Sequence, residues 1–145
     1  MRWSWLVSFL IMVCCCLPVA GEALTIPQTS QAPIIQRAYE FILLLDQDKP
    51  LKAWSHTTRY FRKKMSPQSW QRFYRNQRLR FGRPVERQLG GYRFFSTFEN
   101  ATDGLYLEVR FRTDFEARAN VSEQVMMYKD FDGRWRVIGY FVELD

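Results

Sequence analysis

From Leu105 to Phe115 the odd-numbered side chains are apolar except for Thr113, and the even-numbered ones are charged except for Tyr106. Successive side chains of a β-strand point to opposite faces, so this pattern predicts a strand with one buried face and one polar face. The polar face would carry Tyr106, Glu108, Arg110, Arg112 and Asp114. The strand therefore indicates a sheet that lies with one side on a core.

The same period of two marks three further segments. Gly90 and Gly91 interrupt the first of them, and paired glycines inside a strand indicate a bulge or a sharp bend. Asp132 and Gly133 separate the last two and are a strong signal for a two-residue hairpin. Four consecutive strands joined in this way predict an antiparallel meander. With the alternating strand, the predicted strands are 87–98, 105–115, 121–131 and 134–143.

Helical periods occupy the chain before the strands. From Pro33 to Leu45 apolar residues recur at three- and four-residue steps, which predicts an amphipathic helix with the proline near its first turn. A short second helix is expected from Pro50 to Thr57, followed by a turn that contains Tyr60 and Phe61.

The third predicted helix has clear ends. Ser66 is a suitable cap, Pro67 takes the first helical position, and Gly82 stops the helix. Three N-terminal helices followed by four strands predict an α+β fold, in which the helices pack on one face of a curved, four-stranded antiparallel sheet.

The N-terminus has the features of a secretory signal. Arg2 precedes an apolar stretch from Trp5 to Leu17, and small residues follow up to Ala23. We expect residues 1–23 to be a cleaved signal peptide, with cleavage after Gly21 as the alternative, and a retained anchor as the competing interpretation. A flexible lead-in would then cover residues 24–32, a single domain residues 33–145, and the location would be the periplasm.

Cysteine and histidine usage excludes several chemistries. Cys14, Cys15 and Cys16 all lie in the leader, and Val13 before the first of them does not favour lipidation. His56 is the single histidine. Zinc sites recruit several such ligands and a nucleophilic triad needs a base, so we predict no metal, no cofactor and no triad.

Carboxylates would have to supply any catalysis. Asp46 with Asp48, and Glu108 with Asp114, are predicted to be solvated pairs, and we lean against an enzyme. Glu123 shares the parity of apolar neighbours in its strand, which predicts that it turns inward and forms a buried ion pair with either Arg87 or Arg110.

Aromatic residues make up 17% of the chain, which indicates a dense core or an aromatic-lined cavity. The leading hypothesis is a non-enzymatic domain that binds a small ligand or a protein partner in such a pocket, and the competing interpretation is that the same side chains fill the core. The predicted ligand-binding residues are Trp54, Phe61, Trp70 and Phe111.

Basic residues gather between Arg59 and Arg87, where ten lysines and arginines face one acid, Glu86. Either this is a solvated surface, or it binds anions. An exported chain meets few nucleic acids, so anionic envelope lipid is the better partner. The predicted anion-binding residues are Arg59, Arg62, Lys63, Lys64, Arg72 and Arg75.

The C-terminal half resembles a known family on three stretches: Phe111-Arg112-Thr113-Asp114-Phe115, Glu123-Gln124-Val125 and Asp132-Gly133-Arg134-Trp135-Arg136-Val137-Ile138-Gly139-Tyr140-Phe141. The N-terminal half agrees at Ala53-Trp54-Ser55, Phe61, Ser66, Trp70, Gly82 and Arg87. The family is the domain of unknown function numbered 4019, small exported bacterial proteins. The resemblance implies a cone-shaped, nuclear transport factor 2-like fold, and it brings no activity, cofactor or catalytic residue.

Two further hypotheses complete the sequence-based picture. An enzyme of the cone-shaped class would use a carboxylate or a tyrosine as a base, which requires an acid inside the cavity. A homodimer is the second hypothesis, because both faces of the last strand are apolar: Trp135, Val137 and Phe141 alternate with Ile138, Tyr140 and Val142.

Overall fold

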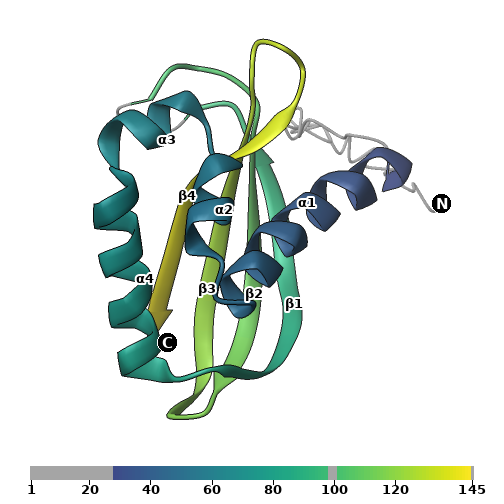
Figure 1. Ribbon diagram of the computed structural model, residues 1–145. Coiled ribbons are helices and arrows are strands. Elements are labelled where there is room, and N and C mark those ends of the chain that lie inside the picture. The colour runs from purple at the N-terminus through teal and green to yellow at the C-terminus, as the bar shows by residue number, and fades with distance from the viewer. Residues whose placement is uncertain (1–27, 98–100, 145) are drawn as a thin grey trace, which may run out of the picture.

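The structure is a computed structural model, and it describes residues 28–97 and 101–144. Four helices are followed by four strands (Figure 1). The helices are α1 (Gln28–Asp46), α2 (Pro50–Ser55), α3 (Arg59–Lys64) and α4 (Pro67–Phe81). The strands are β1 (Pro84–Phe95), β2 (Tyr106–Phe115), β3 (Arg118–Lys129) and β4 (Trp135–Leu144).

The strands form one antiparallel sheet in the order β1-β2-β3-β4, which confirms the predicted meander and the α+β class. The bulge predicted at the glycine pair is present, because the β1–β2 register shifts between Leu89 and Gly91. A hairpin joins β3 and β4 as predicted, but the predicted two-residue turn is wrong, because Asp130 donates its N–H to the carbonyl of Arg134, at 2.9 Å, and the turn therefore has three residues, 131–133. Gly133 has φ +77° and donates its N–H to the carbonyl of Asp130 in the turn between β3 and β4.

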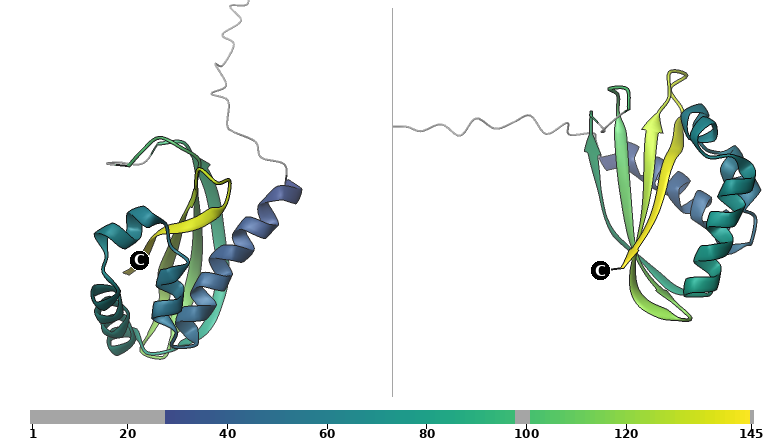
Figure 2. Two further views of the ribbon diagram at one scale, coloured as in Figure 1. Left: turned by 45° about the horizontal axis from the view of Figure 1, so that its top comes forward. Right: turned by 90° about the vertical axis from the view of Figure 1, so that its left-hand side faces the viewer.

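All four helices lie on one face of the sheet, and no helix or strand of the described residues covers the other face, hereafter the bare face (Figure 2). The core fills the space between these two layers. Its most buried members come from both layers and are Ala38, Phe41, Ile42, Ala53, Trp70, Leu107, Val109, Phe111, Val125, Met127 and Val137. The odd-numbered apolar residues of β2 are therefore on the buried face, as their alternation predicts.

The prediction of three helices is wrong, because residues 59–64 form a fourth helix, α3, where a turn was expected. Its start is stabilised by Thr58, whose hydroxyl oxygen accepts the N–H of Phe61. The N–H of Thr58 in turn bonds the carbonyl of Val137, at 2.8 Å, so this short helix is attached to β4. Tertiary anchoring thus stabilises a helix too short to be stable alone.

The ends of α4 match the sequence signals. Ser66 caps the helix by accepting the N–H of Ser69, and Pro67 takes the first position. Gly82 closes the helix with φ +78° and ψ −155°, a conformation found essentially in glycine.

The first helix differs from its prediction. It begins at Gln28 and not at Pro33, so part of the expected lead-in is helical and Pro33 lies inside the helix. A proline near the start removes one intrahelical hydrogen bond, which a long helix with a well-buried face tolerates. The predicted signal peptide lies outside the described residues. Within residues 28–97 and 101–144, the helices are too short or too polar to cross a bilayer.

Candidate functional site

The four predicted ligand-binding aromatics lie in the layer between helices and sheet. Trp70 and Phe111 are each 1% exposed, and Trp54 and Phe61 are partly buried against the same core. The Trp70 ring stacks on Phe73 at 5.4 Å and meets the edge of Phe61 at 5.6 Å. These contacts are those of core residues.

Both indole nitrogens in this layer have partners. Trp54 donates to the carbonyl of Met65 and Trp70 to the carbonyl of Pro50, each at 2.8 Å. The two indoles therefore connect α2 to Met65, just before α4, and to the first turn of α4. A role in ligand binding stays a prediction, and the packing favours the structural role.

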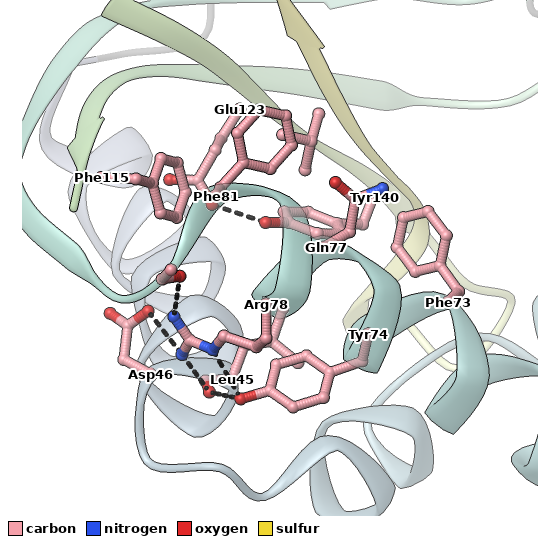
Figure 3. Close-up of a pocket in the computed structure, with 12 residues that line it drawn as sticks. Leu45, Asp46, Phe73, Tyr74, Gln77, Arg78, Phe81, Phe115, Glu123 and Tyr140 are labelled. Atoms are coloured by element: carbon pink, nitrogen blue, oxygen red, sulfur yellow. Dashed lines mark hydrogen bonds and ion pairs between the residues drawn. The ribbon is translucent and has the colours of Figure 1, made fainter. Parts of the chain in front are cut away.

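A small cavity lies beside this layer, between α4 and the ends of β3 and β4 (Figure 3). Its volume is about 20 Å³, which is room for about one water molecule. One side-chain acceptor, Oε1 of Gln77, is buried there without a hydrogen-bond partner in the described structure. The lining residues are Leu45, Asp46, Phe73, Tyr74, Gln77, Arg78, Phe81, Gly82, Phe115, Glu123, Tyr140 and Val142.

A buried polar cluster forms one wall of the cavity. Glu123 is 2% exposed and accepts hydrogen bonds from Arg87 Nε at 2.7 Å, from the Thr113 hydroxyl and from the Tyr140 hydroxyl. Arg87 also reaches both carboxylate oxygens of Asp46, at 2.6 and 3.2 Å. The predicted inward turn of Glu123 and its pairing with Arg87 are confirmed. Figure 3 shows the Tyr140 hydroxyl directed at the Glu123 carboxylate.

The cluster holds its protons tightly. Burial, reinforced by the neighbouring Glu123 carboxylate, raises the pKa of the Tyr140 hydroxyl well above its usual value. Burial alone would lower the pKa of the Arg87 guanidinium, but its hydrogen bonds and charge interactions with Asp46 and Glu123 outweigh burial and raise it. Neither side chain is therefore prepared to exchange a proton near neutral pH.

A second network closes the outer side of the cavity. The Tyr74 hydroxyl bonds Asp48 and the carbonyl of Leu45, and it accepts the Nε–H of Arg78 at 2.8 Å. Arg78 also donates to the Leu45 carbonyl at 2.8 Å. These bonds join the C-terminal end of α1 to the middle of α4. Their partners are side chains and backbone of the protein itself.

The expectation that Glu108 is solvated is wrong. Glu108 is 2% exposed although it lies on the face of β2 opposite the core, because Arg93 and Arg110 cover it and bond its two oxygens. Each buried glutamate of the described residues is thus paired with arginine. The enzyme hypothesis requires an acid that is available inside a cavity. The two carboxylates that line the cavity, those of Glu123 and Asp46, are already paired with Arg87.

His56 is exposed, and the described residues contain no group of three or more His, Cys, Asp and Glu side chains arranged to hold a metal ion. This histidine is the C-cap residue of α2.

The predicted anion-binding residues lie on α3 and the first half of α4. Five of them are exposed and make no ion pair within residues 28–97 and 101–144: Arg59, Lys63, Lys64, Arg72 and Arg75. Arg62 differs, because its guanidinium donates to the carbonyls of Ser55 and Thr57 and lies over the Trp54 ring. Arg62 is therefore a structural residue of the α2–α3 junction.

The surrounding charge is one-sided. Between Asp48 and Glu86 the sequence contains eleven lysines and arginines and no acid. Two of these cations form ion pairs with acids at or just beyond the end of α1. Arg78 pairs with Asp46 and Asp48, and Arg83 pairs with Asp48. The five exposed cations of α3 and α4 are hereafter called the basic helical face: Arg59, Lys63, Lys64, Arg72 and Arg75. The sequence between Asp48 and Glu86 supplies no acid to neutralise them.

The protein is a small α+β domain, as the sequence predicts. A layer of helices covers one side of a four-stranded antiparallel meander, and the interior between them is tightly packed. The model of the family described as Protein of unknown function (DUF4019) matches residues 37–140. This match spans α1 to β4, and the chain belongs to that family. No curated protein matches the chain.

Proposed function

We propose that the protein is an exported, non-enzymatic binding domain whose basic helical face docks on anionic lipid of the cell envelope. The observation that supports this proposal best is the set of five exposed cations on α3 and α4 without an ion pair. Because the aromatic layer is packed and the cavity between α4 and the sheet has room for about one water, the surfaces are the better place for binding. We also propose that the domain belongs to the nuclear transport factor 2-like shape class, which its helix-on-sheet layering supports.

The placement of the face suits a flat partner. α3 and α4 follow one another along one side of the molecule, on the left in Figure 1, away from the bare face of the sheet. Leu79 on α4, four residues after Arg75, is 80% exposed and adds an apolar side chain near these cations. Lysine and arginine stems that carry their charge outward can lie on such a surface while their heads meet phosphate groups.

The expected strength follows from the charges. Each Lys or Arg close to an anionic membrane surface contributes about 1 kcal/mol, so five contribute roughly 5 kcal/mol before ordering costs. This attraction is between exposed charges, and added salt screens it over about 10 Å at 0.1 M. Binding should therefore be reversible and should weaken steeply as salt is added.

Sedimentation with vesicles tests the proposal. The chain, as recovered from the expressing host, should sediment with vesicles of phosphatidylglycerol and phosphatidylcholine at low salt and not with pure phosphatidylcholine. Replacing Lys63, Lys64 and Arg72 together by glutamate should abolish this binding and its salt dependence.

A matched control carries the same charge change elsewhere. Arg118, Lys129 and Arg134 are exposed, make no ion pair among the described residues, and lie on β3 or in the turn that follows it. Their replacement by glutamate lowers the net charge equally and should leave most of the vesicle binding. Equal losses in the two triple variants would mean that net charge acts without a defined face, and the proposal would be withdrawn.

Export has a test of its own. The protein recovered from the periplasm of an expressing bacterium should have a mass that begins at Leu24, or at Glu22 if cleavage follows Gly21. A chain that keeps Met1 and stays with the cytoplasmic fraction would overturn the export proposal.

A further inference from the structure

The bare face of the sheet carries a charged cluster that the basic helical face does not include. In the β1–β2 register, Arg93 lies opposite Glu108, Gly91 opposite Arg110, and Gln88 opposite Arg112. These positions of β2 have the parity that points away from the helices. Three arginines and one carboxylate thus share a short stretch of one sheet face, which Figure 2 shows uncovered.

Glu108 orients two of these arginines. Its two oxygens each accept one Nε–H, from Arg93 and from Arg110. The side chain of Glu108 is 2% exposed, whereas those of Arg93 and Arg110 are 68% and 52% exposed. The terminal nitrogens of both guanidinium groups form no hydrogen bond within the described residues, so their donors are available to a ligand, and the Arg93 guanidinium also lies over the Phe95 ring, at 5.7 Å from its centroid.

Gly91 leaves a space beside this pair. Because Gly91 has no side chain, the position opposite Arg110 is empty, and a Cβ built there would meet no atom within 4 Å. The bulge leaves Gly90 outside the strand pairing. A groove of about 220 Å³ results, lined by Gly90, Gly91, Tyr92, Arg93, Glu108 and Arg110. A second groove of about 370 Å³, lined in part by Arg110, Arg112 and Ser122, adjoins it.

Charge and donor geometry identify the ligand class. Arg93, Arg110 and Arg112 carry three positive charges against the one negative charge of Glu108, which leaves two in excess. Guanidinium forks bind the oxygens of phosphate in pairs, and arginine keeps its charge at any physiological pH. We propose that the groove beside Gly91 binds a phosphate group, held between the free guanidinium ends of Arg93 and Arg110 with Arg112 at its side.

The site is independent of the proposed membrane contact, because it lies on the opposite layer of the molecule. A phosphate group could come from a soluble phosphate monoester or from a lipid headgroup, and the same two guanidinium forks would recognise either. The two sources are distinguished by offering each of them separately to the same set of variants.

The experiment is a titration of inorganic phosphate into the chain, with unfolding temperature as the readout and chloride at matched ionic strength as the reference. Phosphate should raise the unfolding temperature more than chloride does. Arg110→Lys keeps a charge beside Glu108 but loses the fork, and it should weaken the apparent phosphate affinity about fivefold or more.

Arg112→Gln is the second variant, because Arg112 makes no ion pair among the described residues and its loss should not disturb the fold. It should also weaken phosphate binding. Arg75→Gln, on the basic helical face, is the matched control and should not change it. Equal responses to phosphate and chloride, or an equal loss in Arg75→Gln, would overturn the proposal.

Glycerol phosphate and anionic vesicles then identify the source. Dependence of glycerol phosphate binding on Arg110 and Arg112 supports a soluble monoester, and dependence of vesicle binding on them supports a headgroup. If vesicle binding is lost through Lys63, Lys64 and Arg72 while phosphate binding is intact, the two proposals stand separately. Failure of vesicle binding alone would remove the proposed function and leave this site.

Discussion

The Tyr140 hydroxyl on β4 donates its hydrogen bond to Oε1 of Glu123 on β3, and both groups are enclosed between the sheet and α4. The other oxygen of Glu123 is taken by Arg87 and Thr113. Arg87 then continues to the end of α1. One carboxylate thereby connects α1, β1, β2, β3 and β4, through Asp46, Arg87, Thr113, Glu123 and Tyr140.

The first prediction concerns this carboxylate. Glu123→Leu removes one of the two carboxylates that compensate the buried Arg87 charge and leaves the Thr113 and Tyr140 hydroxyls without their acceptor, so it should lower the free energy of unfolding by about 3–5 kcal/mol. The measurement is urea denaturation at pH 7. The double variant Arg87→Met with Glu123→Leu removes both charges and should be more stable than the sum of the two single changes, because the pair is coupled. Additive losses would contradict the pairing.

Tyr140 gives a pH-dependent prediction. Its folded-state pKa is raised by burial and by the Glu123 carboxylate, above the unfolded value of about 10. The folded protein then holds the phenolic proton more tightly than the unfolded chain does. The stabilisation that this difference provides is fully present below pH 10 and is lost as the pH rises from the unfolded pKa through the folded pKa.

Tyr140→Phe should therefore reduce the decline of stability above pH 10. At pH 7 the same variant should be less stable by about 2 kcal/mol, because a hydrogen bond to a charged acceptor is lost. Unfolding by urea, repeated from pH 7 to pH 11, measures both effects. An unchanged slope in the alkaline range would contradict the assignment.

The sequence pattern was sufficient for the sheet and for the direction of Glu123, because parity alone decides on which face a strand residue lies. It was not sufficient for what covers that face. Tyr106 and Glu108 are on the outer side of β2, as predicted, yet each is at most 2% exposed. Phe95 stacks on Tyr106 from β1, so cross-strand neighbours bury what the alternation marks as solvated.

The candidate sites were predictable to different degrees. The basic helical face follows directly from composition between Asp48 and Glu86, and exposed side chains need no tertiary information. The phosphate groove was missed, because it depends on the β1–β2 register that places Gly91 opposite Arg110. The paired glycines predict a bulge. They are also the available signal for a groove, because glycines at a bulge leave the neighbouring strand without a side chain opposite it.

Gly82 provides a third prediction. Its φ of +78° is strained for any other residue, and a Cβ would lie 2.6 Å from Oε2 of Glu116. Gly82→Ala should lower the free energy of unfolding by about 2–3 kcal/mol, measured by thermal denaturation. Gly133→Ala is the control, because φ is +77° there and nothing lies within 4 Å of the added Cβ. If both variants lose the same stability, the contact with Glu116 has no energetic consequence.

The last prediction concerns the cavity itself. Oε1 of Gln77 is buried without a partner in the described structure, and an unsatisfied acceptor costs about 1–3 kcal/mol unless a water molecule reaches it. Gln77→Met keeps the length of the side chain, removes the acceptor, and fills the apolar part of the cavity beside Phe73 and Phe81. We expect the unfolding temperature to rise. A fall would show that the space of about 20 Å³ holds a water that bonds the amide, and that this water contributes to stability.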